Sequence, residues 1–406
     1  MPDSTKGKSP FYPGQPVPVE LFVGRGPQID RILKQGAGQV AAGKPVAMYV
    51  QGEYGIGKSS IAGFAQAVAE RDCGLYAIYA SLGGARSLGD VATGVLEATI
   101  RSGAFDPKRS ERIRSWLGQY IGKQSLFGLT LDFAALKRDE PNLSTPFGML
   151  GFLGEARERL RDTGVVGLFL VLDEINGITG DPQFAHFIKG LVDANAMAKE
   201  PLPLLLMLCG VEERRREMIQ NHQPIDRIFD VIEIHSLTPE EMREFFERAF
   251  GSVQMTVTPV AMSTLVHYSA GFPKIMHMVG DAAYWIDSDG AVDEKDAIAA
   301  VLAAADDVGR KYVDQQVYRA LQSADYHSIL AKIGMISPDR LTFTKEEIES
   351  GLTASERGKF NNFLQKMKQL NVIRSGSVRG EYVFNVRMVR LYIWMRSLPP
   401  AKAAKE

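Results

Sequence analysis

Cysteine is scarce in this chain, and its histidines do not cluster. Only two cysteines, Cys73 and Cys209, occur among the 406 residues. Two cysteines cannot build a disulfide framework, and such a pair is typical of reduced thiols inside the cell. The six histidines show no metal-ligand spacing, so we expect no zinc site.

Long hydrophobic runs are also missing. The longest, VVGLFLVL and PLPLLLML, reach about half the length that a membrane-spanning helix needs, so they predict buried strands instead. The start of the chain, MPDSTKGKSPFYPGQPVP, has no apolar stretch behind its basic residues, and we expect no signal peptide there. These absences predict a cytoplasmic protein without a membrane span.

The chain has no large excess of positive or negative charge, since its net charge is −1. This balance argues against a protein that coats nucleic acid with its whole surface. Residues 325–400, however, contain twelve Lys and Arg against seven Asp and Glu, a local net charge of +5. The sequence therefore indicates an anionic partner for this end of the chain.

The length and composition of the chain are those of a globular protein with more than one domain. A chain of 406 residues is long enough for two or three domains. Its 45% hydrophobic and 23% charged residues are typical of globular proteins. Five apolar stretches separated by helical patterns predict an α/β core, a P-loop NTPase fold with a parallel five-stranded sheet flanked by helices. They are PVAMYVQG, LYAIYASL, GVVGLFLVLDE, LPLLLMLCG and FDVIEIHSL.

Composition and periodicity divide the chain further. We expect an extended Pro- and Gly-rich segment 1–20, a P-loop core 21–237 with an insertion at about 87–161, a helical lid and connector 238–320, a winged-helix domain 321–396 and a tail 397–406. The winged helix is predicted because three helical stretches precede two short strands around a Gly-containing turn. The residues of the insertion do not indicate its role.

The segment Gly52–Ser59, GEYGIGKS, matches the G-x-x-x-x-G-K-[ST] pattern of a phosphate-binding loop. Its glycines let backbone N–H groups converge on phosphate oxygens, Lys58 neutralises charge, and the Ser59 hydroxyl binds Mg²⁺. A plain glycine-rich turn is the alternative, but a buried strand before the loop and a helix after it favour phosphate binding. The predicted nucleotide contacts in the loop are Gly52, Glu53, Tyr54, Gly55, Ile56, Gly57, Lys58, Ser59 and Ser60.

Two carboxylates, Asp173 and Glu174, end the third apolar stretch. A carboxylate at a strand tip beside the loop can hold the water shell of Mg²⁺, and its neighbour can polarise the water that attacks a phosphate. Capping of the following helix is the alternative role for both. We therefore expect Ser59 and Asp173 at a metal ion, with Lys58 and Glu174 as catalytic residues.

Together these motifs resemble those of the AAA+ ATPases, in particular the branch that contains origin-recognition and STAND-type ATPases, over nearly the whole chain. LFVGR resembles the N-terminal box near the adenine, which implies contacts from Phe22 and Val23. PIDRIFDVIEI is similar to the stretch with the arginine finger, which implies that Arg227 acts on the ATP of an adjacent subunit. GFPK resembles the second sensor, which implies a nucleotide contact from Lys274.

Two residues depart from the family pattern. The fourth apolar stretch ends in Cys209, where the first sensor usually has a polar side chain, and a thiol is a poor hydrogen-bond donor. Lys274 keeps the charge of the usual arginine but lacks its planar fork. These changes imply weaker positioning of water and altered closure of the lid. The run Arg214–Arg216 is an alternative supplier of the finger.

The resemblance implies an ATP- and Mg²⁺-dependent switch whose nucleotide state controls self-assembly and, through residues 325–396, engagement of double-stranded DNA or a protein partner. The alternative is a STAND-type signalling or antiphage-defence ATPase with a protein partner and no DNA binding. A nucleotide-holding scaffold with negligible turnover is a third hypothesis, suggested by Cys209. For DNA contact the candidates are Lys359, Asn361, Asn362, Lys366 and Lys368 on the predicted recognition helix and Arg374 and Arg379 on the wing.

Overall fold

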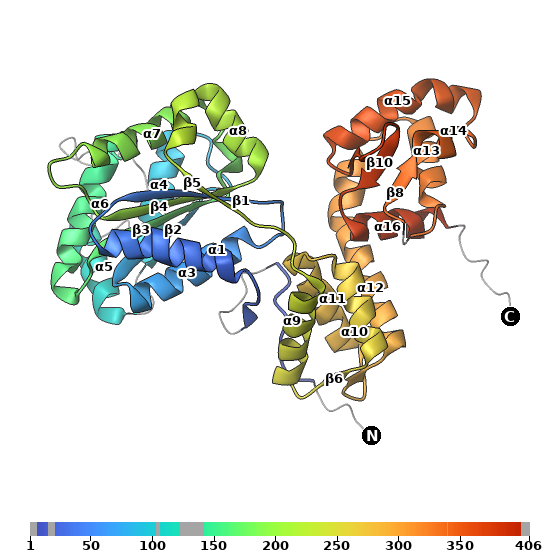
Figure 1. The fold of residues 1–406 in the computed structure, drawn as a ribbon, viewed down its shortest axis with the longest axis horizontal. Coiled ribbons are helices and arrows are strands. Elements are labelled where there is room, and N and C mark those ends of the chain that lie inside the picture. The colour runs from blue at the N-terminus through green and yellow to red at the C-terminus, as the bar shows by residue number, and fades with distance from the viewer. Residues whose placement is uncertain (1–5, 15–20, 103–105, 122–141, 339, 399–406) are drawn as a thin grey trace. The chain divides into compact units, whose positions relative to one another are not determined.

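The computed structural model describes residues 6–14, 21–102, 106–121, 142–338 and 340–398. The chain divides into two compact units (Figure 1). One consists of Pro16–His235, and the other combines Met1–Gln15 with Ser236–Glu406. Within the described ranges, no helix is both long and apolar enough to cross a membrane.

The unit Pro16–His235 is built on a parallel sheet with the strand order β2-β3-β4-β1-β5. The two strands at positions two and three of this order, β3 and β4, are buried along their whole length, as their apolar sequences predicted. The predicted α/β fold with a five-stranded parallel sheet is thus confirmed. The strands are β1 Val46–Gln51, β2 Leu75–Ser81, β3 Gly167–Asp173, β4 Leu204–Gly210 and β5 Asp230–Glu233.

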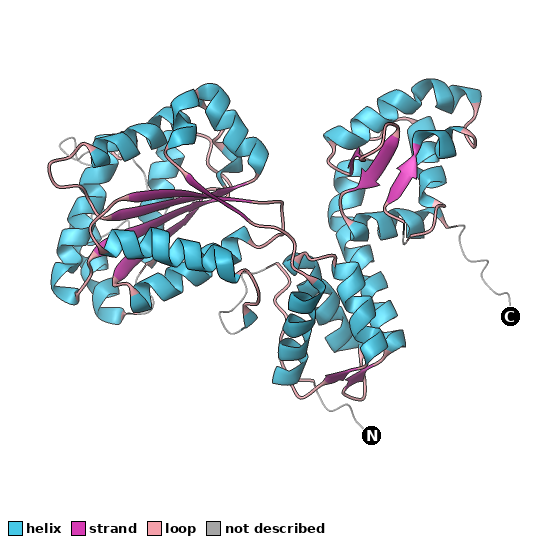
Figure 2. Cartoon of the chain, viewed as in Figure 1, coloured by secondary structure: helices cyan, strands magenta, loops and turns pink. Residues whose placement is uncertain are grey.

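Helices cover both faces of this sheet (Figures 1 and 2). Helix α3 lies on one face, and α7 and α8 lie on the other, which is the arrangement that right-handed crossovers between parallel strands produce. The helical elements of the unit are α1 Gly26–Arg31, η2 Ile32–Ala37, α2 Gly38–Ala41, α3 Lys58–Asp72, α4 Leu88–Arg101, α5 Pro107–Ile121, α6 Pro146–Leu160, η5 Arg161–Thr163, η6 Ile175–Gly177, α7 Pro182–Ala196, α8 Glu212–Asn221 and η7 Gln223–Arg227.

The stretch between β2 and β3, where an insertion was expected, contributes α4, α5 and α6 to the core of the unit. Ser87 opens α4 through a capping box with Asp90, and Thr145 caps α6. Apolar side chains of all three helices, among them Val95, Trp116 and Phe152, belong to the same buried cluster as the sheet. The part of the predicted insertion from 122 to 141 lies outside the described residues.

The second unit begins with a bundle of helices after Ser236. A capping box between Thr238 and Glu241 opens its first helix, and this T-x-x-E spacing is typical of a helix start. The elements are α9 Pro239–Ser252, β6 Thr256–Val257, α10 Pro259–Ser269, α11 Pro273–Ile286, β7 Ala291–Val292, α12 Glu294–Val308 and η8 Gly309–Tyr318. Strands β6 and β7 form a short parallel pair that periodicity did not predict, because each has only two residues.

The same unit ends in a small domain with its own buried cluster. The predicted three helices and hairpin are present, and the structure adds β8 and α16. The elements are α13 Ala324–Gly334, β8 Thr342–Thr344, α14 Lys345–Glu349, α15 Ala354–Gln369, β9 Ile373–Ser375, β10 Glu381–Phe384 and α16 Arg387–Ser397. The three strands pair antiparallel in the order β8-β10-β9.

The N-terminal segment docks on the helices of this second unit. Phe11 is only 4% exposed, and its ring packs against rings of α9 and α11. A Cβ atom at Gly280 would lie 2.3 Å from the Phe11 ring, so this glycine leaves the room that the ring fills. The backbone N–H of Tyr12 donates to Nδ1 of His277 at 3.1 Å. Both ends of the chain therefore contribute to one unit.

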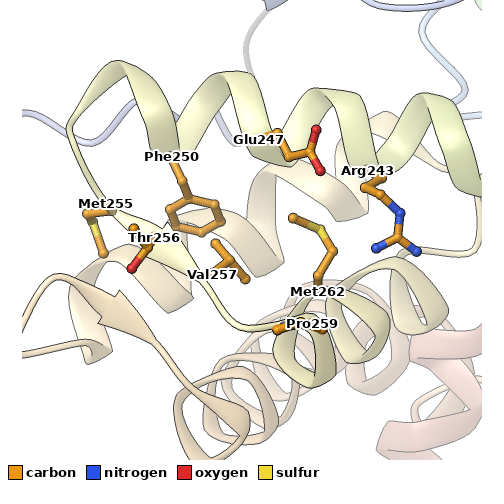
Figure 3. Close-up of a pocket in the computed structure, with 8 residues that line it drawn as sticks. All are labelled: Arg243, Glu247, Phe250, Met255, Thr256, Val257, Pro259 and Met262. Carbon is orange, nitrogen blue, oxygen red and sulfur yellow. The ribbon is translucent and has the colours of Figure 1, made fainter.

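A cavity of about 380 Å³ lies in the same unit, between α9, β6 and the start of α10 (Figure 3). Its lining includes the apolar side chains of Phe250, Val257 and Met262 and the charged side chains of Arg243 and Glu247. None of the residues predicted from sequence to bind nucleotide or metal lines this cavity.

Candidate nucleotide-binding site

The glycine-rich loop joins β1 to α3, as the sequence predicted. At Gly52 a Cβ atom would lie 2.9 Å from the backbone oxygen of Ile234, and Gly57 has a φ of 97°, so both positions need glycine. Helix α3 begins directly after this turn at Lys58. The free N–H groups of its first turn therefore lie beside the loop, where they can bind an anion.

Lys58 lies folded over the loop. Its Nζ donates to the backbone oxygens of Gly52 at 2.9 Å and Glu53 at 2.8 Å, and it lies 5.5 Å from the centroid of the Tyr54 ring. Burial lowers the pKa of this lysine, although the nearby carboxylate of Asp173 opposes the shift. The ammonium group is thus held at the loop by carbonyl oxygens, which phosphate oxygens can replace as acceptors.

The hydroxyl of Ser59 meets the carboxylate of Asp173. Ser59 Oγ donates to Asp173 Oδ2 at 2.6 Å, and the backbone N–H of Glu174 donates to the other oxygen, Oδ1, at 2.8 Å. Asp173 is only 3% exposed. A hydroxyl and a carboxylate at this distance are hard oxygen donors of the kind that Mg²⁺ prefers, so the two residues fit the metal expected there.

Strand β2 adds two hydroxyl groups that the motifs did not predict. Tyr79 OH donates to Asp173 Oδ2, and Ser81 Oγ donates to Glu174 Oε2 at 3.0 Å. Glu174 itself is exposed and has a φ of 56°, which turns the chain at the end of β3. Each of the two acidic residues is therefore held by a hydroxyl from the neighbouring strand.

Cys209 is fully buried at the end of β4. Its position in the sheet is set by β1, where Val50 is its partner. Burial raises the pKa of the thiol, and the charge of Asp173 adds to this effect. The side chain is therefore a neutral thiol next to the charged groups of the site, with little capacity to position water by hydrogen bonding.

The LFVGR segment lies against the loop and α3. Phe22 stacks on Phe64 of α3 with 4.7 Å between ring centroids, and Val23 is buried. The buried Arg25, which the sequence did not single out, donates from its guanidinium group to the backbone oxygens of Ile56 and Gly57. Its φ of 62° is a further feature that no motif indicated. Arg25 thus ties the N-terminal box to the glycine-rich loop.

The predicted cations outside the loop differ in their surroundings. Arg227 is exposed at the end of η7 and makes no ion pair with any other described residue. In the alternative run, Arg214 pairs with Glu217 at 2.6 Å, Arg215 with Asp226, and Arg216 with Glu212 at 2.5 Å. Lys274 lies exposed in the first turn of α11, in the other unit. The first unit thus brings together Lys58, Ser59, Asp173 and Glu174.

Comparisons with known proteins place this fold. No protein-family model matches the chain, and no curated protein does. Among solved structures, a Walker-type ATPase of Pyrococcus abyssi is similar with a TM-score of 0.58 and 16% identity, over 92% of this chain and 96% of that one. The ORC2 protein of Aeropyrum pernix, solved in ADPNP and ADP complexes, is similar with a TM-score of 0.58 and 12% identity, over 98% of each chain.

The parallel sheet, the glycine-rich loop after β1 and these similarities together give the chain a P-loop ATPase fold. More narrowly, the chain shares its fold with this Walker-type ATPase and with the ORC2 protein, which confirms, at the level of the fold, the resemblance to origin-recognition ATPases noted in the sequence.

Proposed function

We propose that this chain binds ATP with Mg²⁺ and hydrolyses it. The observation that carries the proposal is the contact between Ser59 and Asp173 at 2.6 Å, with Lys58 at the same loop. These residues come from different parts of the sequence, and a plain turn or a helix cap would not require them to meet. The backbone of Gly52–Ser60 and Lys58 would hold the phosphates, and Phe22 and Val23 would contact the adenine.

The residues divide the chemistry between them. Ser59 would bind Mg²⁺ directly and Asp173 through its water shell, and the bound ion would neutralise charge on the β- and γ-phosphates. Glu174 would accept a proton from the water that attacks the γ-phosphorus, while the bond to the bridging oxygen breaks and ADP leaves. The carboxylate of Glu174 is exposed, so it is open to such a water. Lys58 would stabilise the charge that develops on the phosphate oxygens.

Assembly and partner binding form the second part of the proposal. The exposed Arg227 would act as an arginine finger on the ATP of an adjacent copy. Lys274 would contact the nucleotide and couple its state to closure of the helical lid. Residues 325–396, with the helix order of a winged helix, would engage double-stranded DNA or a protein partner. Duplex DNA is favoured because this end of the chain carries the net positive charge. We place this switch in the cytoplasm, where both free thiols stay reduced.

Nucleotide binding and turnover test the core of the proposal. Fluorescent ATP should bind with Mg²⁺, and the purified protein should release phosphate. Glu174→Gln should bind nucleotide as the parent does but release phosphate at least about a hundredfold more slowly, the typical contribution of a general base. Glu158→Gln, which changes an exposed glutamate of α6 that pairs with Arg161 at 3.2 Å, is the matched control and should keep its turnover. Equal rates in parent and Glu174→Gln would exclude the proposed role of Glu174.

A further inference from the structure

Tyr79 makes a contact that no phosphate-loop motif accounts for. It lies two residues before Ser81 on β2, so both side chains point to the same face of the sheet. Its hydroxyl donates to Asp173 Oδ2, the oxygen that also accepts from Ser59. The second carboxylate oxygen of Asp173 accepts from the backbone N–H of Glu174. Three donors therefore fix the orientation of one carboxylate.

We propose that Tyr79 is a positioning residue that orients Asp173 for Mg²⁺; this inference rests on the proposed function. The Ser59 oxygen is expected to ligate the metal ion, so its geometry depends on the ion being bound. The backbone donor from Glu174 fixes only Oδ1. Tyr79 is thus the side chain that donates to Oδ2 without being a proposed ligand of the ion. Partners of this kind, one step removed from the ion, tune metal affinity.

A hydroxyl group suits this role. The phenol of tyrosine carries a proton at neutral pH and can donate it to a carboxylate oxygen. A phenylalanine in its place would keep the half-buried ring and remove only the hydrogen bond to the carboxylate.

The same strand offers a matched control. Tyr76 is also a tyrosine of β2, and its hydroxyl lies 2.5 Å from Ser102 Oγ, a residue that plays no part in the proposed site. Its hydroxyl is buried as well, and burial raises its pKa to about 12. Tyr76→Phe therefore removes a buried tyrosine hydroxyl from the same strand without touching Asp173.

The test compares the parent, Tyr79→Phe and Tyr76→Phe as full-length chains. A fluorescent ATP analogue is titrated in EDTA and at a series of Mg²⁺ concentrations, and thermal unfolding midpoints check folding. Tyr79→Phe should bind nucleotide in EDTA as the parent does, but the Mg²⁺ concentration for half-maximal tightening should rise about tenfold, the lower end for such partners. Tyr76→Phe should follow the parent in both conditions.

The outcomes separate the two proposals. Should the parent bind the analogue and respond to Mg²⁺ while the Mg²⁺ response of Tyr79→Phe matches that of Tyr76→Phe, the role of Tyr79 is overturned and the proposed function stands. Should the parent bind no nucleotide under any condition, the proposed function and this inference both fall. A loss of affinity in EDTA as large as that in Mg²⁺ would show a structural effect and would also overturn the positioning role.

Discussion

Ser59 Oγ and Asp173 Oδ2 lie 2.6 Å apart, although a whole run of helices separates the two residues along the chain. Ser59 is in the first turn of α3, after β1, and Asp173 is the last residue of β3. Strand β4 lies between β1 and β3 in the sheet. The contact therefore reaches across one strand, and it depends on the strand order and not on any local motif.

Removal of the loop cation should weaken nucleotide binding. For Lys58→Ala we expect the dissociation constant of ATP with Mg²⁺ to rise about 10–100-fold, because a charge-assisted hydrogen bond contributes roughly 1.5–3 kcal/mol. Equilibrium titration with fluorescent ATP measures this change. Lys34→Ala removes an exposed lysine that pairs with Asp30 at 2.7 Å and should leave the constant unchanged. Equal affinities in Lys58→Ala and Lys34→Ala would contradict the assigned role.

If Arg227 acts on the ATP of an adjacent subunit, two variants with low turnover should restore activity when they are mixed. Arg227→Ala should bind ATP normally but turn it over about a thousandfold more slowly. Mixed with Glu174→Gln, it should regain activity, because the Glu174→Gln subunit still supplies its own Arg227 to the intact site of its neighbour. Arg161→Ala, which loses an exposed arginine paired with Glu158 at 3.2 Å, is the control and should keep its turnover. A mixture no more active than its components would rule out the trans role.

The C-terminal domain should bind duplex DNA with an affinity that falls as salt rises. Arg379, exposed in the turn between β9 and β10, should contribute one phosphate contact, so Arg379→Ala should reduce the salt slope by about one. Lys359 is already paired with Asp325 at 2.6 Å, so Lys359→Ala should have less effect. Filter binding at several salt concentrations measures both. No detectable binding of the parent, with or without ATP, would favour a protein partner instead.

The docked N-terminal segment should stabilise the second unit. Phe11→Ala should lower the free energy of unfolding by about 3 kcal/mol, the lower end for a buried phenylalanine. Urea denaturation of the full chain measures the loss. Tyr12→Phe keeps the backbone N–H that donates to His277 and should be nearly neutral. If Phe11→Ala unfolds at the same urea concentration as the parent, the segment does not contribute to stability.

Acid should weaken the same docking through His277. Burial lowers the pKa of this histidine to about 4, and its Nδ1 must be unprotonated to accept from Tyr12. The folded pKa lies below the unfolded value of about 6.5, so the stabilisation is complete above about pH 6.5 and is lost as the pH falls toward 4, by up to about 3 kcal/mol.

A variant that cannot titrate isolates this effect. His277→Gln keeps an oxygen that can accept from Tyr12 but has no titrating ring. Its free energy of unfolding, followed by urea denaturation across the acidic range, should fall less steeply than that of the parent. Parallel pH profiles for the two proteins would contradict the assignment to His277.

Sequence reasoning predicted those features that depend on neighbouring residues. The glycine-rich loop could be recognised because its spacing is local, and the positive φ of Gly57 is the kind of geometry that such a glycine signals. The strands could be recognised because β3 and β4 are apolar on both faces. The acidic pair Asp173 and Glu174 could be placed because it ends one of these strands.

Features that depend on pairing between distant segments were missed. Tyr79 and Ser81 meet the acidic residues only because β2 and β3 pair in a register that puts Ser81 opposite Asp173. Nothing in LYAIYAS distinguishes Tyr79 from Tyr76, whose hydroxyl lies against Ser102. Arg25 contacts the glycine-rich loop from a backbone turn with positive φ, which the local sequence does not predict. These contacts follow from the tertiary fold and have no local signature.

The packing of the Phe11 ring against the second unit determines which fragments of this protein should fold well. A fragment that starts at Ser236 would lack the segment around Phe11, and the hollow beside Gly280 would open to water among Phe245, Phe246 and Phe250. An open aromatic hollow of this kind favours aggregation. A well-behaved C-terminal fragment should therefore carry residues 6–14 as well, joined through a flexible linker or supplied as a separate peptide.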